Sequence, residues 1–359
     1  MFDEKLIKEA LSNVFDPATG QDILTIGMVK SIKIDGNNIN LTIQIKQNNA
    51  ELKSDMNFAC ISALQDIYPT SNVNIHIVVD DSINNSPLPQ IKNIIAVASG
   101  KGGVGKSTVS VNIALALKQL GATVGLMDAD LYGPSIPTML GLQGQRPKIQ
   151  DVYGKPRIVP LDANGLPVIS IGFLVEPEQA VVLRGPRLGG IIKQFINDTT
   201  WSPLDYLIID LPPGTGDIQL TLVQTVPITG AVIVTTPQEV AVVDAIKAMN
   251  MFMLPQVNVP ILGVVENMSW FSPAELPDNK YFIFGKGGGQ RLANEANSIL
   301  LGKIPLVQSV REGGDNGKPI VETDDQSSEI FIDIAKKLME QTKLRNDKLA
   351  PTQIIQMQN

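Results

Sequence analysis

Residues 99–108 read Ser-Gly-Lys-Gly-Gly-Val-Gly-Lys-Ser-Thr and have the spacing of a phosphate-binding loop. The pattern G-x-x-x-x-G-K-[ST] falls on Gly100, Gly105, Lys106 and Ser107. Glycines let the backbone bend so that successive N–H groups point at phosphate oxygens, and a helix beginning at Lys106 adds its positive end. In such a loop the lysine supplies a cation for the β- and γ-phosphates, and the hydroxyl binds Mg²⁺. The residues predicted to contact the nucleotide are Gly100, Lys101, Gly102, Gly103, Val104, Gly105, Lys106, Ser107 and Thr108.

Three carboxylates follow apolar runs at positions where they can complete this site. Asp128 and Asp130 follow one run, and Asp210 follows another. An acid at the end of a buried strand marks the open edge of a sheet, where ligands bind. We predict that Asp128 and Asp210 join Ser107 in the Mg²⁺ shell and that Asp130 orients or deprotonates the attacking water. The alternative is that these acids cap the turns or helices that follow them.

Two further residues give the loop a more specific character. Lys101 directly follows the first glycine and provides a second cation, for which we predict a catalytic role. Asn267 follows the apolar run 261–265, and its amide can both donate to and accept from the edge of an adenine. We therefore predict ATP as the nucleotide and Asn267 as the base reader; the alternative is an ordinary asparagine in a strand-end turn. The glycines of segment 212–216 allow two backbone states and predict a loop that senses the γ-phosphate.

The pattern from residue 93 onward predicts an α/β domain with a mostly parallel sheet covered by helices on both faces. Apolar runs typical of strands fall at 94–98, 123–127, 206–209, 231–234, 261–265 and 299–304. Helical stretches are expected at 106–120, 189–197, 219–226, 240–254 and 289–296, with a last helix over about 327–343. This arrangement places the phosphate-binding loop at the carboxyl end of the first strand, where ligands of such sheets bind.

Residues 1–80 follow a different pattern, which predicts a small α+β domain with the order helix, strand, strand, helix, strand. The helices are expected at 3–13 and 53–67, and the strands at 28–34, 39–45 and 73–79. A polar, proline-containing linker follows at 81–92. The nucleotide-binding domain is then predicted to span 93–345, and residues 346–359 to form a polar tail.

The composition limits the classes of function. The chain has 359 residues, 43% of them hydrophobic, and a net charge of −7, which predicts a sizeable core and argues against a nucleic-acid-binding surface. No apolar run reaches the roughly 18 residues of a membrane span, and the first residues lack the apolar core of a signal peptide. A single cysteine excludes an internal disulfide, and with a single histidine it leaves little from which to build a zinc site. These counts fit a cytoplasmic protein.

Several stretches resemble one known family. Lys101 is the signature lysine of the deviant Walker A class, which includes MinD, ParA and the nitrogenase iron protein. Over residues 92–340 the chain resembles the Mrp/ApbC-type iron–sulfur cluster carrier ATPases, on the basis of Asp128-Ala-Asp-Leu-Tyr-Gly-Pro-Ser135, Leu183-Arg-Gly-Pro186, segment 204–217, Val234-Thr-Thr-Pro-Gln-Glu239 and Gly263-Val-Val-Glu-Asn-Met-Ser269. The N-terminal region, with Val14-Phe-Asp-Pro17 and Asp22-Ile-Leu-Thr-Ile-Gly27, is similar to the small iron–sulfur-assembly domain that precedes the ATPase in many members.

The resemblance implies a homodimer that hydrolyses ATP slowly with Mg²⁺ and delivers iron–sulfur clusters to apoproteins or works with assembly factors. In this class the signature lysine reaches across the dimer to the partner's nucleotide, a role that falls here to Lys101. Lys106, Ser107, Asp130 and Asp210 match the family's nucleotide, Mg²⁺ and hydrolysis positions. A second cation at the γ-phosphate makes closure of the dimer sensitive to ATP against ADP.

The chain departs from the family at the cluster ligands. The better-known members carry a C-x-x-C pair shortly after the Glu-Asn-Met segment, so that two subunits supply four thiolates. Here the stretch 269–289 contains no cysteine, and Ser272 and Glu275 stand about where thiolates are expected. Hydroxyl and carboxylate groups are poor substitutes for the soft ligands of iron–sulfide clusters. The resemblance therefore implies a cluster, while its ligands in this chain are unknown.

Other residues near these regions leave alternatives open. Cys60 is the only thiol and is interpreted as a buried core residue or as one ligand per subunit, with the others supplied by a partner or glutathione. His76 alternates away from two neighbouring isoleucines, so a solvated side chain is expected rather than a ligand. Trp270 and Phe271 either form an exposed aromatic contact for a partner or pack against the protein.

Three functions follow from these observations. The first is an ATPase that carries iron–sulfur clusters with atypical ligands, and the second is an ATP-switched dimeric adaptor that holds no cluster itself. The third is a MinD/ParA-like positioning ATPase that acts on a membrane or DNA. The third needs a basic amphipathic tail or a basic surface, and segment 349–359 offers neither. We therefore expect no membrane and no nucleic acid among the partners.

Overall fold

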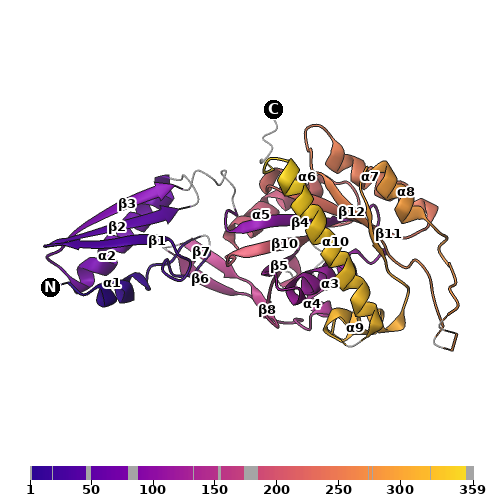
Figure 1. Cartoon of the computed structure of the whole chain (residues 1–359), viewed down its shortest axis with the longest axis horizontal. Helices are drawn as coiled ribbons and strands as arrows, with labels where there is room; N and C mark the ends of the chain where they lie inside the picture. Colours follow the sequence, from indigo (N-terminus) through magenta and orange to yellow (C-terminus); the bar gives the residue numbers. More distant parts are fainter. Residues whose placement is uncertain are drawn as a thin grey trace. The chain divides into compact units, whose positions relative to one another are not determined.

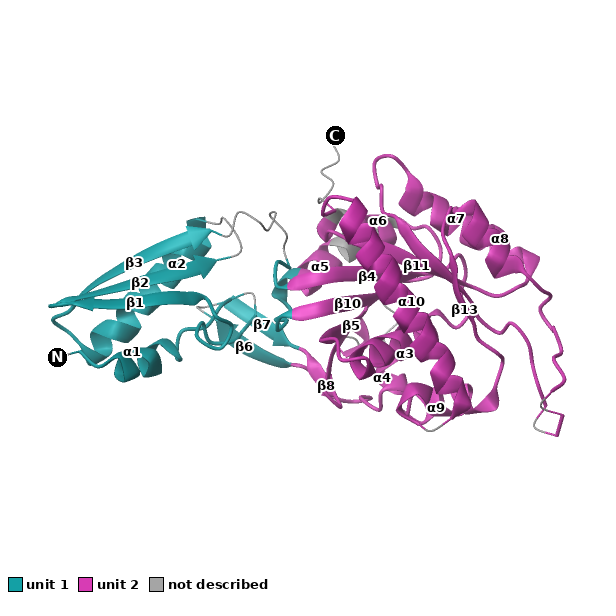
Figure 2. Cartoon of the chain, in the orientation of Figure 1, with its two compact units in different colours: residues 1–90, 148–159, 197–203 teal, residues 91–147, 160–196, 204–359 magenta. Residues whose placement is uncertain are grey.

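The computed structural model describes residues 2–17, 19–45, 50–79, 88–131, 133–152, 155–173, 185–273, 275–276, 278–323 and 325–352. Figure 1 shows its helices and strands, and Figure 2 its two compact units. The first unit comprises residues 1–90, 148–159 and 197–203, and the second comprises 91–147, 160–196 and 204–359. Some parts of the sequence interpretation lie outside the described residues: linker residues 81–87, tail residues 353–359, Tyr132 of the motif 128–135, and Leu183 with Arg184. None of the described helices combines the length and the hydrophobicity that a membrane span needs.

The N-terminal elements follow the predicted order. They are α1 (Glu4–Leu11), β1 (Val29–Asp35), β2 (Asn38–Ile45), α2 (Ala50–Ile67) and β3 (Asn72–Val79). In the three-stranded sheet, β2 is central, antiparallel to β1 and parallel to β3. The predicted hairpin is confirmed, because Asp35 pairs with Asn38 and Gly36 adopts a φ of +56° in the tight turn between them. Alternate residues of β2, from Ile39 to Ile45, are buried against the two helices.

Two segments that lie much later in the chain complete the first unit and were not expected from the sequence. They are the antiparallel hairpin of β6 (Lys148–Val152) and β7 (Lys155–Val159), and the stretch 197–203. Lys155 forms an ion pair with Glu51 at 2.8 Å, and Arg157 donates to the Asn197 carbonyl at 2.6 Å. Most of the hairpin is exposed or half-buried, so the buried-strand alternation that predicts a strand is absent from its sequence.

The second unit is built on an eight-stranded sheet of order β13-β12-β11-β4-β10-β5-β9-β8. All pairs are parallel except β8 with β9, so the predicted fold class is confirmed. The strands that were expected begin and end within a few residues of the predicted bounds, whereas β8 and β9 are short and were missed. The strands are β4 (Ile91–Ala98), β5 (Val124–Asp128), β8 (Leu161–Ala163), β9 (Leu166–Ser170), β10 (Leu204–Asp210), β11 (Gly230–Thr235), β12 (Ile261–Glu266) and β13 (Leu300–Lys303).

Helices cover both faces of this sheet. Helices α3 and α10 pack beside each other on one face, and α7 and α8 pack against β11 and β12 on the other (Figure 1). The last helix continues to Lys348 instead of ending near residue 343, and it stops just before Pro351, which disfavours helix in the preceding residue. The helices are α3 (Lys106–Gln119), α4 (Ile136–Met139), α5 (Gly185–Asp198), α6 (Asp217–Thr225), α7 (Glu239–Met253), α8 (Gly288–Glu295), α9 (Gln308–Asp315) and α10 (Gln326–Lys348), with 3₁₀ turns η1 (Ile171–Phe173) and η2 (Ile320–Glu322).

One aspartate ties together three strands at the edge of the sheet opposite the phosphate-binding loop. The Asp205 carboxylate accepts from the Lys92 ammonium at 2.7 Å and from the Thr123 N–H and hydroxyl at 2.9 and 2.8 Å. These donors, the Lys92 ammonium first, lower the pKa of Asp205 to about 2. The carboxylate therefore stabilises the fold when it is ionised.

We expect Asp205→Asn to lower the free energy of unfolding by about 1–2 kcal/mol at pH 7, because charge-assisted hydrogen bonds are lost. Since the folded-state pKa lies below the unfolded value of about 3.9, this contribution is present above about pH 4 and is lost as the pH falls toward 2. Urea unfolding at pH 7 and pH 3 checks both points. The gap between wild type and variant should narrow at pH 3, while Asp333→Asn, which removes an exposed ion pair, should change little at either pH. An equal gap at both pH values contradicts the assignment.

Candidate nucleotide-binding site

The phosphate-binding loop connects β4 to α3, as the sequence predicts. Its first glycine, Gly100, packs against the backbone of Asp244 and Ala245 in α7, where any side chain would collide. Gly103 and Gly105 have φ values of +81° and +80°, a left-handed conformation that favours glycine. Gly105 is also the residue before the first turn of α3, so the free N–H groups of that turn face the loop. Gly100 is thus required because the backbone of α7 lies against it, and Gly103 and Gly105 are favoured by their left-handed backbone conformation.

The loop lines a cavity of about 240 Å³. Residues 101–108 form one wall, and Asp130 lies on the same cavity, as the sequence interpretation proposed. Gly133, Ser135 and Met139, from the segment after β5 and from α4, also line it, and the sequence analysis missed them. Pro213, in the predicted γ-phosphate-sensing segment, completes the lining, and the neighbouring Gly214 N–H donates to the Ser99 carbonyl at 2.9 Å. The segment predicted to sense phosphate is therefore joined directly to the start of the loop.

Lys106 and the strand-end carboxylates lie together beside this cavity. The Lys106 ammonium is 2.7 Å from Asp210 Oδ2 and 3.7 Å from Asp130 Oδ2. The Ser107 hydroxyl donates to Asp210 Oδ2 at 2.6 Å, and the Ser110 hydroxyl donates to Asp210 Oδ1 at 2.6 Å. Asp210 is fully buried and Lys106 is 6% exposed. Lys106 is therefore held by carboxylates of two strand ends.

Asp128 lies next to Asp210 in the sheet, since the two residues are paired in register between β5 and β10. It is fully buried; burial first, and then the charge of Asp210, raise the pKa of Asp128 to about 8. One oxygen accepts from the Asp130 N–H at 3.1 Å and the other from the Ser170 hydroxyl at 2.9 Å. Two carboxyl groups thus lie side by side near a single ammonium, and a divalent cation bound there would favour the ionised form of Asp128.

The donor atoms at this position fit Mg²⁺. Mg²⁺ takes oxygen ligands, and it usually needs only one or two carboxylates because phosphates and water supply the rest. Ser107 Oγ and Asp210 meet at 2.6 Å, and Asp128 lies beside them, which is such a set. Among the side chains that the structure describes, no group of three or more His, Cys, Asp or Glu could hold a metal ion. This set of oxygens therefore suits a cation that arrives with a nucleotide.

Lys101 differs from Lys106 in its surroundings. It is half-buried on the wall of the cavity, and its ammonium has no ion pair within the described ranges of the chain. The Ser99 hydroxyl donates to the Lys101 carbonyl at 3.0 Å and fixes the backbone at this position. A lysine whose ammonium has no ion pair among the described residues can reach a group outside its own cavity.

Asn267 contacts the loop directly. It is 7% exposed, and its Nδ2 donates to the Val104 carbonyl at 2.8 Å and leaves no room for a side chain at Gly105. The sequence predicted a base reader, and the structure adds a contact that braces the loop. The side-chain amide has a second N–H and the oxygen Oδ1 besides the bond to Val104. Asn267 is not among the described residues that line the cavity.

The cysteine-free stretch 269–289 leaves β12 and returns at α8. Phe271 pairs with Tyr281 across it, and both are exposed, as are Phe282 and Ile283. The alternatives for the two aromatics are resolved separately: Phe271 is 37% exposed, whereas Trp270 is half-buried with the Lys280 ammonium 4.4 Å above its ring. Ser272 is half-buried and Glu275 is exposed. The two residues at the family's thiolate positions thus belong to a partly apolar surface segment.

Glu266, which the sequence analysis passed over, joins the two ends of this stretch. It is the last residue of β12 and is 1% exposed. Its carboxylate accepts from the Ser269 hydroxyl at 3.0 Å and from the Gly289 N–H at 2.7 Å. A buried acid directly after an apolar strand was the available signal, and it was read only as part of the Glu-Asn-Met motif. The Glu266 carboxylate therefore links Ser269, at the start of stretch 269–289, to Gly289 at its end.

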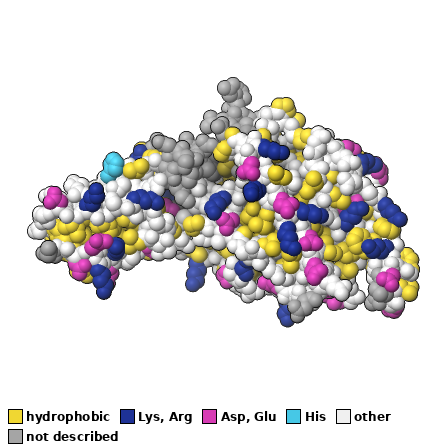
Figure 3. Space-filling view, viewed as in Figure 1, with side chains coloured by type: hydrophobic (Ala, Val, Ile, Leu, Met, Phe, Trp, Pro, Cys, Tyr) yellow, Lys and Arg dark blue, Asp and Glu magenta, His cyan; other side chains and the backbone are white. Residues whose placement is uncertain are grey.

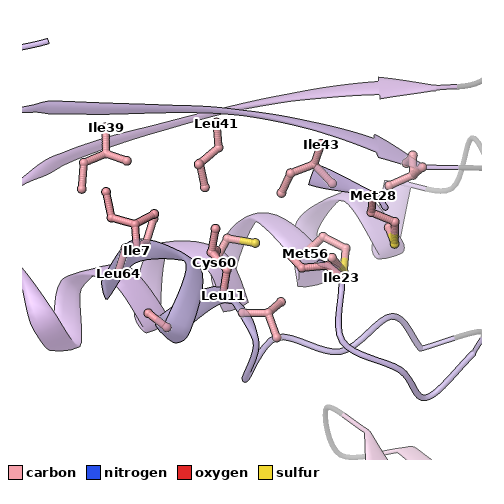
Figure 4. Packing of buried hydrophobic residues seen from close by; sticks show 13 residues of the cluster. Ile7, Leu11, Ile23, Met28, Ile39, Leu41, Ile43, Met56, Cys60 and Leu64 are labelled. Carbon is pink, nitrogen blue, oxygen red and sulfur yellow. The ribbon is translucent and has the colours of Figure 1, made fainter. Parts of the chain in front are cut away.

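Cys60 and His76 lie in the first unit. His76, the only histidine, is exposed on β3 as alternation predicts, and Figure 3 shows it on the surface. Cys60 is fully buried among Leu41, Met56 and other apolar side chains (Figure 4). Burial raises the pKa of the Cys60 thiol to about 12, so the thiolate that a metal needs is disfavoured. The interpretation of Cys60 as a core residue is therefore supported, and its alternative as a ligand is not.

Comparison with solved structures defines the class. A nucleotide-binding protein from Archaeoglobus fulgidus, in complex with ADP, is 36% identical and covers 68% of this chain and 94% of its own, with a TM-score of 0.58. The cell-division ATPase MinD of Pyrococcus furiosus is 21% identical over 69% of this chain and 99% of its own, with a TM-score of 0.51, which shows the shared fold. Together with the loop and its carboxylates, these similarities define a P-loop NTPase with the MinD/ParA fold.

Comparison with families is more specific. A model described as the NUBPL iron-transfer P-loop NTPase matches residues 90–339, and one described as an iron–sulfur cluster assembly protein matches residues 4–77. The iron-sulfur cluster carrier protein of Synechocystis is 43% identical over 94% of this chain and 97% of its own. That of Deinococcus radiodurans is 42% identical over 96% and 97%. The chain belongs to the iron-transfer P-loop NTPase family, and the resemblance stated from its motifs is confirmed.

Proposed function

We propose that this protein is a Mg²⁺-dependent ATPase that acts as a homodimer in the cytoplasm and carries iron–sulfur clusters to apoproteins. The observation that carries this proposal is that Lys106 and Ser107, which line the cavity, meet the buried strand-end aspartates Asp210 and Asp128 beside it, in a chain of the iron-transfer family. Relatives that match almost the whole chain bear the name of iron–sulfur cluster carrier protein. The small N-terminal domain matches an assembly family as well.

In the proposed mechanism, the loop N–H groups and Lys106 bind the triphosphate. Lys106 exchanges its contact with Asp210 for the β- and γ-phosphates, while Ser107 and Asp210, with Asp128 beside them, hold Mg²⁺. The cation neutralises phosphate charge when it is bound. Asp130, which lines the cavity, orients the attacking water or accepts its proton. Lys101 of each protomer stabilises the charge on the partner's γ-phosphate, which makes closure of the dimer depend on ATP.

The ligands of the cluster are the open part of this proposal. The segment that carries thiolates in other members has none here, and Cys60 is buried with a raised pKa. In the carrier form, thiols of the apoprotein or of glutathione supply the cluster ligands, since the hydroxyl and carboxylate groups of stretch 269–289 are poor ones. The same observations favour a second candidate, an ATP-switched adaptor in iron–sulfur assembly that holds no cluster. A positioning ATPase is not favoured, since positive and negative side chains are interspersed on the face in Figure 3.

Anaerobic reconstitution with iron, sulfide and glutathione tests the proposal. The carrier form predicts protein-bound iron, a visible absorption band, and transfer of the cluster to an apoprotein. Cys60→Ala, as a matched variant, should bind the same amount of iron, since its thiol is enclosed by the core. A wild-type chain that hydrolyses ATP and binds no iron identifies the adaptor instead. Loss of iron in a folded Cys60→Ala variant contradicts the assignment of Cys60 to the core.

The nucleotide preference can be tested at Asn267. We expect Asn267→Ala to lower the preference for ATP over GTP by about tenfold, because the acceptor for the 6-amino group is lost. Asn267→Asp keeps an acceptor and loses the donor to Val104, so it should weaken both nucleotides while it keeps the preference. Equilibrium binding of fluorescent ATP and GTP analogues measures both effects. An unchanged preference in Asn267→Ala points to a different base reader.

A further inference from the structure

We propose that Ser170 is a positioning residue for the magnesium site: its hydroxyl fixes the orientation of Asp128 and joins it to the loop that forms the far wall of the nucleotide cavity. The inference rests on the proposed function, since it assumes that Asp128 belongs to the magnesium shell. Ser170 carries no recognisable motif, and the strand that ends with it was not predicted from the sequence. Its role follows only from where β9 places it.

The register of the sheet brings Ser170 to Asp128. Strand β9 runs parallel to β5, and their last residues, Ser170 and Asp128, are direct partners. Both side chains are fully buried. The Ser170 hydroxyl donates to Asp128 Oδ2 at 2.9 Å, while the Asp130 N–H donates to Oδ1 at 3.1 Å. The carboxylate is therefore held at both oxygens, one by its own chain and one by the neighbouring strand.

A second hydrogen bond orients the hydroxyl proton of Ser170. Ser170 Oγ accepts from the Gly172 N–H at 3.0 Å, at the turn that follows β9. A hydroxyl has one proton to donate, and with the N–H of Gly172 directed at its oxygen, that proton is directed to Asp128. Chains of hydrogen bonds in a buried site strengthen one another, so the group acts as an oriented donor. Ser110 does the equivalent for Asp210, whose Oδ1 accepts its hydroxyl at 2.6 Å.

The same turn contacts the wall of the cavity. A side chain at Gly172 would meet Pro134 at 2.9 Å, so the backbone of this turn lies directly under Pro134. The two residues that flank Pro134, Gly133 and Ser135, line the cavity that the phosphate-binding loop forms. Ser170 is thus the link between a strand-end carboxylate and a segment that lines the cavity. Without the Ser170 hydroxyl, Asp128 loses one of the two donors that hold its carboxylate in place.

The test measures metal binding and does not depend on turnover. Mn²⁺ replaces Mg²⁺ at oxygen sites and is followed by electron paramagnetic resonance in the presence of saturating ADP. We expect Ser170→Ala to raise the dissociation constant of Mn²⁺ by about tenfold, which is the typical effect of removing a residue that orients a metal ligand. Affinity for ADP without metal should stay within about twofold of wild type, because the loop contacts are untouched.

Two further variants separate positioning from stability. Thr342→Val removes another buried hydroxyl, one that bonds only within α10, and should leave Mn²⁺ binding unchanged. Ser170→Thr keeps the hydroxyl and should restore Mn²⁺ affinity toward that of wild type. If Ser170→Ala does not fold, Ser170→Cys takes its place, since it keeps the size and offers only a weak donor.

The outcomes distinguish this inference from the proposed function. If wild type binds ADP and Mn²⁺ and Ser170→Ala binds Mn²⁺ equally well with a lower melting temperature, Ser170 is structural and the inference is overturned while the proposed function stands. If wild type binds ADP without taking up Mn²⁺, both fall. A weakened Mn²⁺ site that Ser170→Thr rescues supports both.

Discussion

Replacing Lys101 by alanine is expected to leave ATP affinity within a few-fold of wild type and to lower the rate of hydrolysis by about 1,000-fold. In the proposed mechanism, Lys106 and the loop N–H groups bind the phosphates. The Lys101 ammonium, which has no ion pair among the described residues, would instead act on charge that develops in the transition state. Steady-state phosphate release, together with equilibrium binding of a fluorescent ATP analogue, measures the two quantities. Such a split between binding and turnover identifies a group that interacts mainly with the transition state.

The matched control is Lys336→Ala, which removes an exposed lysine of α10 whose ion pair is with Asp333. It should change neither binding nor turnover, because a surface ion pair contributes little. A Lys101→Ala variant with normal turnover removes this residue from the mechanism. A variant that loses binding to the same extent as turnover assigns Lys101 to ground-state binding.

The second large effect is expected at Lys106. Lys106→Ala should lower ATP affinity by at least about 100-fold and abolish hydrolysis, since the cation for the β- and γ-phosphates is lost. It should also destabilise the second unit by about 3 kcal/mol, because Asp210, fully buried, is left without the ammonium at 2.7 Å. Isothermal titration with a non-hydrolysable ATP analogue and thermal unfolding without nucleotide measure the two effects. Unchanged binding shows that the phosphates lie elsewhere.

Asp130→Asn provides the contrast to Lys106→Ala. Asp130 lies 3.7 Å from Lys106 at the cavity, and the amide keeps its shape while it removes the base. ATP should bind with near-normal affinity and should hardly be cleaved, a loss of about 100-fold or more. If hydrolysis is unaffected while binding is weakened, Asp130 serves the cation and not the water.

The parts of the site that the sequence predicted are those with local signals. The glycine spacing of 99–108 and the acids that end two apolar strands need only neighbouring residues to be recognised. The alternating pattern of β2 and the apolar runs of β4, β10 and β11 gave the sheets for the same reason. Parallel strands then bring Asp128 and Asp210 together without further information, because their carboxyl ends share one edge.

The parts that the sequence could not predict depend on tertiary contacts. Ser170 and Ser110 are ordinary serines until the register of β9 and the first turns of α3 direct them at carboxylates. The loop contact of Asn267 joins residues that are far apart in the chain, and no spacing rule relates Asn267 to Val104. Hairpin β6–β7 was missed because its residues are mostly exposed and carry no alternation. Hydrogen bonds across the fold carry no local signature.

This chain shares the nucleotide-binding loop of its family but has no cysteine in stretch 269–289. It has a phosphate-binding loop with Lys106, Ser107 and Asp210 in contact, and its relatives bear the name of cluster carriers. The segment where the other members hold their cysteines is kept closed at its base by Glu266 and exposes Phe271 and Tyr281. A labile cluster that relies on external thiols is consistent with a carrier whose cargo must leave it.

Mixing two inactive variants tests the central claim, that two protomers share their lysines over ATP. Lys101→Ala keeps a site that binds ATP, and Lys106→Ala keeps the lysine that acts across the dimer. An equal mixture is predicted to recover about a quarter of wild-type ATP hydrolysis, since half of the dimers are mixed and each has one complete site. A mixture that exchanges subunits and is no more active than its two components contradicts the account.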